Sequence, residues 1–413
     1  MPLNLQPFRS RLRPGALVLA TLFVLGLGTL LARRPSAAPE PSRPVCDVPF
    51  SNLNSQIYMR GTANQSDSLW VVLDTGASAH VIDESLAVRM RLPLSNPHES
   101  HGAGGSQRSH MARDVTTRFG CMEYKDSRIA TIPMAPVSAQ AGRNLDVILG
   151  YPLLSKWVVE VDYAAERLRF HDPKKFNYRG NGASLPLEFI ENLPYIEAEI
   201  ELPGRAPVRG QFVLDTGSST TLILAPAFVE KTRALETLSR SVETSGRGVG
   251  GASSSVAGRI AAITLGGYRL ESPTVMFRRP GPGGVSAHGS AGNIGGAILK
   301  RFRVYFDYPR KRMILEPNAR LGDPFEIDMT GFQLAASPGQ SGFRVARVAP
   351  DTPAAEAGVA EGDMLVSVDG RPANEIGIAK IRESFRVPDR TYALAFLRGE
   401  RTIEVRLTTR RIV

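Results

Sequence analysis

The chain repeats itself, and this internal duplication constrains its fold more than any other feature of the sequence. Residues 71–78 read Val-Val-Leu-Asp-Thr-Gly-Ala-Ser, and residues 212–219 read Phe-Val-Leu-Asp-Thr-Gly-Ser-Ser. A second pair of matching blocks follows downstream, at 148–163 and 293–308. Motifs that recur in the same order at similar spacing indicate two copies of one structural unit.

Each copy is predicted to be mainly β. Residues 71–73 and 212–214 are typical of short buried strands, and residues 195–200 alternate between apolar and polar side chains as a half-exposed strand does. Glycine and proline interrupt the pattern often, and long helical periodicity is scarce. We therefore expect two mainly β halves, at 46–180 and 181–321.

The remaining residues, 322–413, have a different character. Residues 343–348 and 392–407 are typical of strands, whereas 374–386 have the apolar spacing of a helix. These alternating elements predict a separate α+β module after the duplicated halves.

The first 34 residues are typical of an export segment. Arginines precede an uncharged apolar run at 15–32, and the positive-inside rule keeps their side in the cytoplasm. The length of the run lies between that of a signal peptide core and that of a membrane anchor, so cleavage and anchoring both stay open. A linker rich in proline, serine and alanine follows at 35–45. We expect the rest of the chain in the bacterial periplasm, or membrane-anchored and facing the periplasm or the outside.

Charge, cysteine and histidine content limit the possible partners and cofactors of the protein. The net charge of +10 comes from scattered Lys and Arg residues without a recognition helix or an aromatic-lined basic groove, so we predict no nucleic-acid partner. Cys46 and Cys121 can pair in an oxidising compartment or stay as two buried thiols, and the spacing does not decide. The six histidines show no metal-ligand spacing. We therefore predict neither a metal site nor a cofactor.

The repeated Asp-Thr-Gly motif carries the predicted chemistry. Two copies related by a pseudo-two-fold axis can bring Asp74 and Asp215 to one point. Two carboxylates at one site share a proton, so that one acts as a base towards water and the other as an acid towards a carbonyl oxygen. Such a pair titrates as a unit, so neither role is assigned to one aspartate.

The neighbours of the two aspartates suit this task. Gly76 and Gly217 let the backbone pack closely around the carboxylates. Thr75 and Thr216 place hydroxyls where each can bond to the opposite loop. Two glycine-rich segments follow, which we expect to form flaps over an extended substrate, with mobile surface loops as the alternative. The flap candidates are Gly102, Gly104 and Gly105 in the first half and Gly248, Gly250 and Gly251 in the second.

Each half resembles a retroviral-type (retropepsin-like) aspartic protease protomer over roughly 45–320. The shared order is apolar residues and Asp-Thr-Gly, a glycine-rich flap, then Ile-Leu-Gly or Asn-Ile-Gly before a short helix. The resemblance implies duplicated β-barrel halves around a central cleft, and metal-free peptide hydrolysis by water with Asp74 and Asp215 as the dyad. Because one chain supplies both halves, it also implies an active monomer. A pepsin-like protein is disfavoured because its halves are longer and its flap carries a tyrosine.

The two motifs differ at the next residue, which is Ala77 in the first half and Ser218 in the second. A missing hydroxyl donor near one carboxylate disfavours its ionised form. We therefore expect a mildly acidic, not a strongly acidic, pH optimum.

The C-terminal module resembles a bacterial PDZ domain. Residues 329–334 are similar to the carboxylate-binding loop of that family, and 352–363 match its Thr-Pro-Ala, Ala-Gly and Gly-Asp pattern. The resemblance implies binding of a C-terminal or extended peptide by β-augmentation, with the helix near 374–386 as the other wall. The alternative is an internal brace on the protease. The candidate peptide-binding residues are Thr330, Gly331, Phe332 and Gln333.

Together these features predict an exported aspartic endopeptidase that acts on proteins or peptides, with a PDZ domain that recruits substrate or regulates activity. The alternative is a non-catalytic peptide-binding scaffold of the cell envelope. A serine hydrolase is disfavoured, because no Gly-x-Ser-x-Gly sequence forms a nucleophile elbow.

Overall fold

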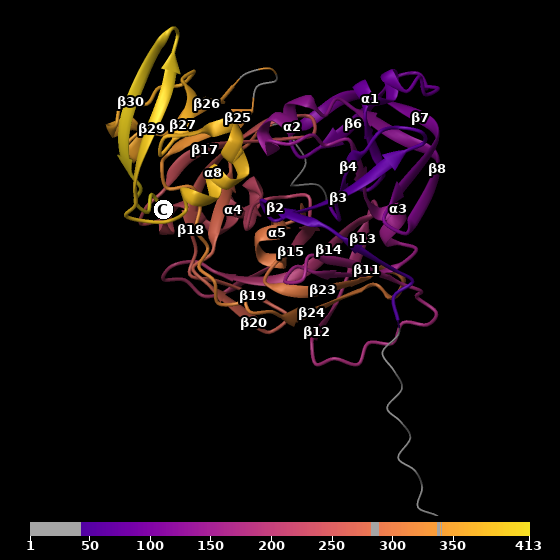
Figure 1. Cartoon of the computed structure of the whole chain (residues 1–413). Helices are drawn as coiled ribbons and strands as arrows, with labels where there is room; N and C mark the ends of the chain where they lie inside the picture. Colours follow the sequence, from indigo (N-terminus) through magenta and orange to yellow (C-terminus); the bar gives the residue numbers. More distant parts are fainter. Residues whose placement is uncertain (1–42, 282–288, 337–338, 340) are drawn as a thin grey trace, which may run out of the picture. The chain divides into compact units, whose positions relative to one another are not determined.

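The computed structural model describes residues 43–281, 289–336, 339 and 341–413 (Figure 1). The predicted export segment at 1–34 therefore lies outside the described residues, as does most of the linker. Within the described part of the chain, no helix is long and apolar enough to cross a membrane.

The first half is built on an eight-stranded sheet with the order β2-β3-β4-β9-β5-β8-β7-β6. Its strands are β2 (Ser51–Leu53), β3 (Gln56–Ala63), β4 (Leu69–Leu73), β5 (Val81–Asp83), β6 (His98–Gly102), β7 (Gly105–Phe119), β8 (Met122–Ile132) and β9 (Val147–Leu149). Its helices are α1 (Glu84–Arg89), α2 (Ala135–Ala141) and α3 (Tyr151–Leu154).

The second half is built on a ten-stranded sheet in which β17-β18-β21-β16-β22-β15-β14-β19-β20 follow in order and β13 pairs with β14. Its strands are β13 (Glu188–Ile190), β14 (Leu193–Glu201), β15 (Val208–Asp215), β16 (Leu222–Leu224), β17 (Val242–Gly248), β18 (Gly251–Arg259), β19 (Ala262–Leu265), β20 (Tyr268–Glu271), β21 (Thr274–Arg278) and β22 (Gly292–Gly295). Its helices are α4 (Pro226–Thr232), α5 (Gly296–Leu299) and the short 3₁₀ segments η1 (Ala234–Thr237) and η3 (Tyr308–Arg310).

The two sheets repeat the same unusual connections. Strand β4 pairs in parallel with β9, and β15 pairs in parallel with β22. In the same way β5 pairs in parallel with β8, and β16 with β21. The strands that precede the two aspartates are thus held by equivalent neighbours, which is the duplication of the sequence expressed as topology.

A third sheet joins the halves, with the order β1-β11-β10-β23-β24-β12. Its strands are β1 (Cys46–Pro49), β10 (Val158–Asp162), β11 (Arg167–His171), β12 (Ala183–Pro186), β23 (Phe302–Asp307) and β24 (Arg312–Pro317). At its centre β10 and β23 run antiparallel, with Val161 opposite Val304. These strands belong to the second pair of matching blocks, so each copy pairs with the other.

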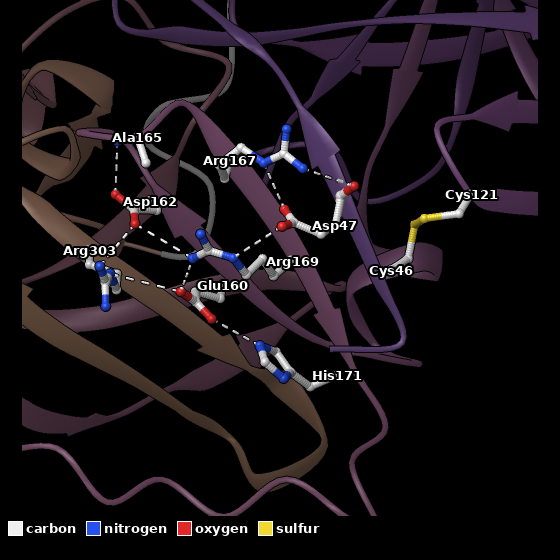
Figure 2. A network of polar contacts seen from close by, with 10 residues as sticks. All are labelled: Cys46, Asp47, Cys121, Glu160, Asp162, Ala165, Arg167, Arg169, His171 and Arg303. Atoms are coloured by element: carbon white, nitrogen blue, oxygen red, sulfur yellow. Dashed lines mark hydrogen bonds and ion pairs between the residues drawn. A yellow bond between two sulfur atoms is a disulfide. The ribbon is translucent and has the colours of Figure 1, made fainter. Parts of the chain in front are cut away.

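Charged side chains on this sheet also tie the halves together (Figure 2). Arg303 of the second half lies 2.9 Å from Asp162 of the first. Glu160 bonds to Arg169 at 2.6 Å and to His171 at 2.9 Å. Burial opposes the charge on both carboxylates. His171 and Arg169 outweigh it at Glu160, and the N–H of Ala165 together with Arg303 and Arg169 outweighs it at Asp162, so the pKa of each lies below the usual range.

Replacing Arg303 by methionine is expected to destabilise the folded protein by about 1–2 kcal/mol at about pH 7, since Arg303 is partly exposed and the pair is partly screened. A carboxyl group with a lowered pKa stabilises the folded state above its unfolded pKa, and this stability is lost as the pH falls. The difference from wild type should therefore shrink towards about pH 3 in urea unfolding. Arg167→Met, whose partner Asp47 lies in the same half, is the matched control. If the difference in unfolding free energy between the variant and wild type is as large at about pH 3 as at about pH 7, the prediction is wrong.

A disulfide fixes the edge of the same sheet. Cys46 in β1 is bonded to Cys121, which lies in the turn between β7 and β8, with a Cα–Cα distance of 5.7 Å (Figure 2). The bond settles the pairing that the spacing left open. It ties the sheet between the halves to the long hairpin of the first half.

The C-terminal module has its own core, to which Phe332, Phe385 and Phe396 contribute. Its sheet has the order β25-β26-β27-β29-β30, with β28 paired to β27. Its elements are β25 (Phe332–Ala336), β26 (Phe343–Val348), β27 (Met364–Val368), β28 (Arg371–Pro372), β29 (Thr391–Arg398), β30 (Arg401–Thr408), α6 (Pro353–Glu356), α7 (Ala373–Ile376) and α8 (Ile378–Ser384). The helix expected near 374–386 is two helices, because Gly377 separates them with a φ of 83°.

Candidate active site

The two Asp-Thr-Gly motifs meet between the halves. The carboxyl groups of Asp74 and Asp215 share a hydrogen bond. Gly76 lies so close to the opposite aspartate that a Cβ atom there would sit 2.7 Å from Asp215 Cγ. A Cβ atom at Gly217 would overlap the carboxyl group of Asp74. Only glycine at both positions allows the two carboxyl groups to approach each other.

Thr75 and Thr216 cross-link the two loops. The Thr75 hydroxyl donates to Leu214 O at 2.8 Å, and the Thr216 hydroxyl donates to Leu73 O at 2.9 Å. Each hydroxyl also accepts the backbone N–H of the other threonine at 3.0 Å. Both threonines are fully buried. Four hydrogen bonds that water cannot reach therefore set the position of one aspartate relative to the other.

Burial raises the pKa of both aspartates, but their surroundings are unequal. The charge and the hydrogen bond of Asp215 raise the pKa of Asp74 further. Both carboxyl groups accept backbone N–H groups of the loops, but only Asp215 also receives the Asn293 amide, at 2.6 Å. This donor favours the charge on Asp215 and the shared proton on Asp74.

The source of this asymmetry differs from the sequence-based expectation. The Ser218 hydroxyl bonds to Thr220 Oγ1 at 2.8 Å, and it is the Ser218 backbone N–H that favours the charged form of Asp215. Asn293 provides the side-chain donor, and sequence reasoning missed it. Its counterpart in the first repeat is Ile148, so an amide in place of an apolar residue within the matching blocks was the available signal.

Asn293→Ile makes the two repeats alike at this position. The substitution removes a donor to ionised Asp215, so the pKa of Asp215 should rise. If the aspartates act as the dyad, the acidic limb of the profile of kcat/KM against pH should move up by about one unit while the alkaline limb moves less. Asn293→Asp is unsuitable as a control because it adds charge; Ile148→Val keeps the first half apolar and serves better. An acidic limb that stays in place would contradict the role of Asn293.

The glycine-rich segments form two hairpins that meet at their tips. Gly104 donates its N–H to Val249 O at 2.7 Å, and Gly250 donates to Gln107 Oε1 at 3.2 Å. Arg278 of the second half reaches Ala103 O at 2.7 Å. Added Cβ atoms would overlap the opposite tip at four of the six flap candidates, namely Gly102, Gly104, Gly248 and Gly250. Of the other two candidates, Gly105 meets Gly250, and Gly251 lies beside Gly104.

The candidate PDZ residues lie at the start of β25 but do not all face one open groove. Gly331 has a φ of 87° and packs against Thr352, which only glycine allows. Phe332 is buried in the core of the module, and Gln333 bonds to β17 of the second half. Thr330 donates its N–H to Asp328 at 2.8 Å. Burial raises the pKa of Asp328 to about 6, so an acidic group stands next to the loop expected to bind a carboxylate.

Among the residues that the structure describes, no three His, Cys, Asp or Glu side chains come together in a way that could hold a metal ion. The groups that meet around the dyad include the two carboxyls and the Asn293 amide. Such a set can activate water.

Comparisons with known proteins agree with the sequence resemblance. The aspartyl protease family model matches residues 59–153 and 197–295, one segment in each half. A PDZ domain model matches residues 344–391, starting after the loop at 330–333. The solved structure of the aspartic proteinase from Irpex lacteus is 15% identical and covers 68% of this chain and 99% of that chain, with a TM-score of 0.42. A search of curated proteins found no match. The chain therefore consists of two aspartyl protease halves of the retropepsin-like type followed by a PDZ domain, in a mainly β fold.

Proposed function

We propose that this protein is an exported aspartic endopeptidase that uses Asp74 and Asp215 to hydrolyse peptide bonds in proteins or peptides. The observation that carries the proposal is the pair of buried, hydrogen-bonded carboxyl groups, both with a raised pKa, of which Asp74 holds the proton more strongly. Burying two acidic groups side by side costs free energy, and packing alone does not require it. A catalytic dyad explains why glycines and crossed threonines hold the two groups together.

The proposed reaction follows from these preferences. Ionised Asp215 takes a proton from a water molecule, whose oxygen attacks the carbonyl carbon of the peptide bond. Asp74 gives its proton to the carbonyl oxygen, so a neutral tetrahedral diol forms. When the diol collapses, Asp215 gives its new proton to the amine nitrogen, Asp74 takes the proton of one diol hydroxyl, and the C–N bond breaks to release an amine and a carboxylic acid. Asp74 is then protonated and Asp215 ionised again, as at the start.

One chain supplies both aspartates and both flaps, which supports an active monomer. An extended peptide would lie between the flap tips and the dyad, so the tips must part for it to enter. The Cys46–Cys121 disulfide supports export, since such bonds persist in oxidising compartments such as the periplasm. In this proposal residues 15–32 direct export, either as a cleaved signal peptide or as a membrane anchor.

The test is digestion of a mixed peptide library by the purified protein, with products identified by mass spectrometry. A pepstatin-type inhibitor and the double variant Asp74→Asn/Asp215→Asn run alongside. We expect cleavage at internal bonds, inhibition by the peptide analogue and no cleavage by the double variant. Cleavage by the double variant would refute the dyad. Binding of peptides without cleavage by the wild-type protein would favour the non-catalytic scaffold.

A further inference from the structure

Strand β25 of the PDZ domain is the edge of its sheet, and its free side is where an extended peptide would pair. Leu334 of β25 lies opposite Val345 of β26. The N–H and C=O of Val345 bond to Asp363 O and Gly362 N on its other side. In an antiparallel pair this makes Leu334 and Val345 a non-hydrogen-bonded pair, so the backbone groups of Leu334 point away from β26.

Other parts of the same chain already contact that edge of β25. Arg382 of α8 donates to Leu334 O at 2.6 Å and to Gln140 O of the protease helix α2 at 2.9 Å. Helix α2 packs along β25. Its C-cap residue Gly142 touches Ile378, the first residue of α8, so closely that a Cβ atom there would overlap it. A helix of the first protease half thus occupies the side of β25 that a peptide ligand needs.

The same contacts reach the surroundings of the candidate dyad. Val137 and Ala141 of α2 pack against the apolar cluster that contains Ile148 and is touched by Val249 of the second flap tip. Ile148 adjoins Leu149, whose C=O accepts the N–H of Asp74. Displacing α2 would therefore loosen a wall next to the candidate dyad.

Gln333 ties β25 to the flap of the second half. Its amide donates to Thr244 Oγ1 at 2.6 Å and to Ser245 O at 3.1 Å. The Ser245 hydroxyl donates back to Gln333 Oε1 at 2.9 Å. Both residues belong to β17, the strand that leads to the flap tip. One strand of the PDZ domain therefore holds a wall of the first half and the flap of the second.

We propose that the PDZ domain is a latch on the closed cleft, and that an extended peptide pairing with β25 opens it by displacing α2. Such a peptide requires Leu334 C=O and the space beside it, which Arg382 and α2 now hold. Peptide binding and the closed arrangement therefore exclude each other, and each shifts the equilibrium of the other by the same free energy. The expected effect on peptide cleavage rests on the proposed protease function. The displacement of α2 can be measured without any cleavage.

The first experiment releases the latch by substitution. Gln333→Met removes the three polar bonds to β17 at similar volume. Arg382→Lys keeps a charge near Asp328 but replaces a fork that reaches two carbonyls with one ammonium. Hydrogen exchange should speed up about tenfold at residues 242–248 in the first variant and at 135–142 in the second. Arg344→Met, on the exposed side of β26, is the control and should change neither segment.

Measurements of peptide cleavage then distinguish a PDZ domain that restrains the protease (a latch) from one that supports its active form (a brace). Released variants should cleave a library peptide with kcat/KM raised about threefold to tenfold, at unchanged melting temperature of the PDZ domain. Unchanged exchange in both segments would overturn the proposal, and so would faster exchange with lower activity, since that is the behaviour of a brace. If the wild-type protein cleaves nothing, the proposed protease function fails, while the exchange data still decide the latch.

The second experiment adds a ligand to the full chain that carries Asp74→Asn, so that peptides are not consumed. The probe is a pool of random decapeptides, with either free or amidated C-termini. We expect slower exchange in β25 together with faster exchange at 135–142. The amidated pool should act as well as the free one, because Asp328 stands beside the carboxylate loop. Protection of β25 without release of α2, or no change at saturating concentrations of either pool, would overturn the proposal.

Discussion

Replacing Asp74 alone by asparagine is expected to lower kcat/KM by about a thousandfold or more and, at the same time, to stabilise the folded protein at about pH 7. The loss of activity follows because the amide cannot give a proton to the carbonyl oxygen. The gain in stability follows from the raised pKa of Asp74. Above its unfolded pKa the carboxyl ionises readily in the unfolded chain but not in the folded one, so it favours unfolding there. An asparagine removes that penalty.

Peptide cleavage and thermal unfolding measure the two effects. The melting temperature should rise by about 2–4 °C at about pH 7, and the rise should vanish below about pH 3, where both states are protonated. Asp114→Asn, at an exposed position on β7, is the matched control and should alter neither quantity. Activity within tenfold of wild type would exclude Asp74 from the dyad. A lower melting temperature would mean that its carboxyl is a structural acceptor.

The sequence predicted the architecture of the site well because its determinants are local or repeated. Asp-Thr-Gly places an acid, a hydroxyl and a residue without a side chain next to one another, and the duplication supplies the partner loop. Glycines at the flap tips were visible for the same reason. The two family matches agree with the resemblance that these motifs suggested.

The features of the site that the sequence did not predict are contacts between residues far apart in the chain. Asn293 lies 78 residues from the carboxylate that it contacts, and Gln56, which donates to Gly217 O, lies 161 residues from its partner. The role given to Ser218 assumed that a hydroxyl next to the motif reaches the carboxyl. The turn directs it to Thr220 instead.

Helix α2 illustrates the same limit for the PDZ domain. Its residues are mostly small, with one proline and one glutamine, and nothing in that pattern predicts its contact with Arg382, which lies 242 positions from Gln140. Sequence reasoning therefore kept peptide binding and bracing as alternatives. The proposed latch makes them two states of one contact, since the edge that would bind a peptide is the edge that now holds α2.

Thr75→Val is expected to destabilise the folded protein by about 2–5 kcal/mol and to lower kcat/KM by about a hundredfold. Valine has nearly the shape of threonine but no hydroxyl, so Leu214 O loses its donor and the N–H of Thr216 loses its acceptor. Both groups are in a fully buried region where water cannot replace the bond. The activity falls because the two aspartates come from loops whose relative position these bonds set.

Thr75→Ser tests this reasoning, because it keeps the hydroxyl and loses only a methyl group. It should retain the dyad geometry and most of the activity, at a cost of about 1 kcal/mol for the lost methyl group. Thr216→Val should resemble Thr75→Val, since the crossed bonds are symmetric. The double Val variant should cost less than the sum of the single variants, because the loss of either pair of bonds already lets the two loops shift and weakens the pair that remains. Urea unfolding and peptide cleavage measure all four variants. Additive losses would mean that the threonines act separately, and the crossed bonds would then not be what aligns the two carboxyl groups.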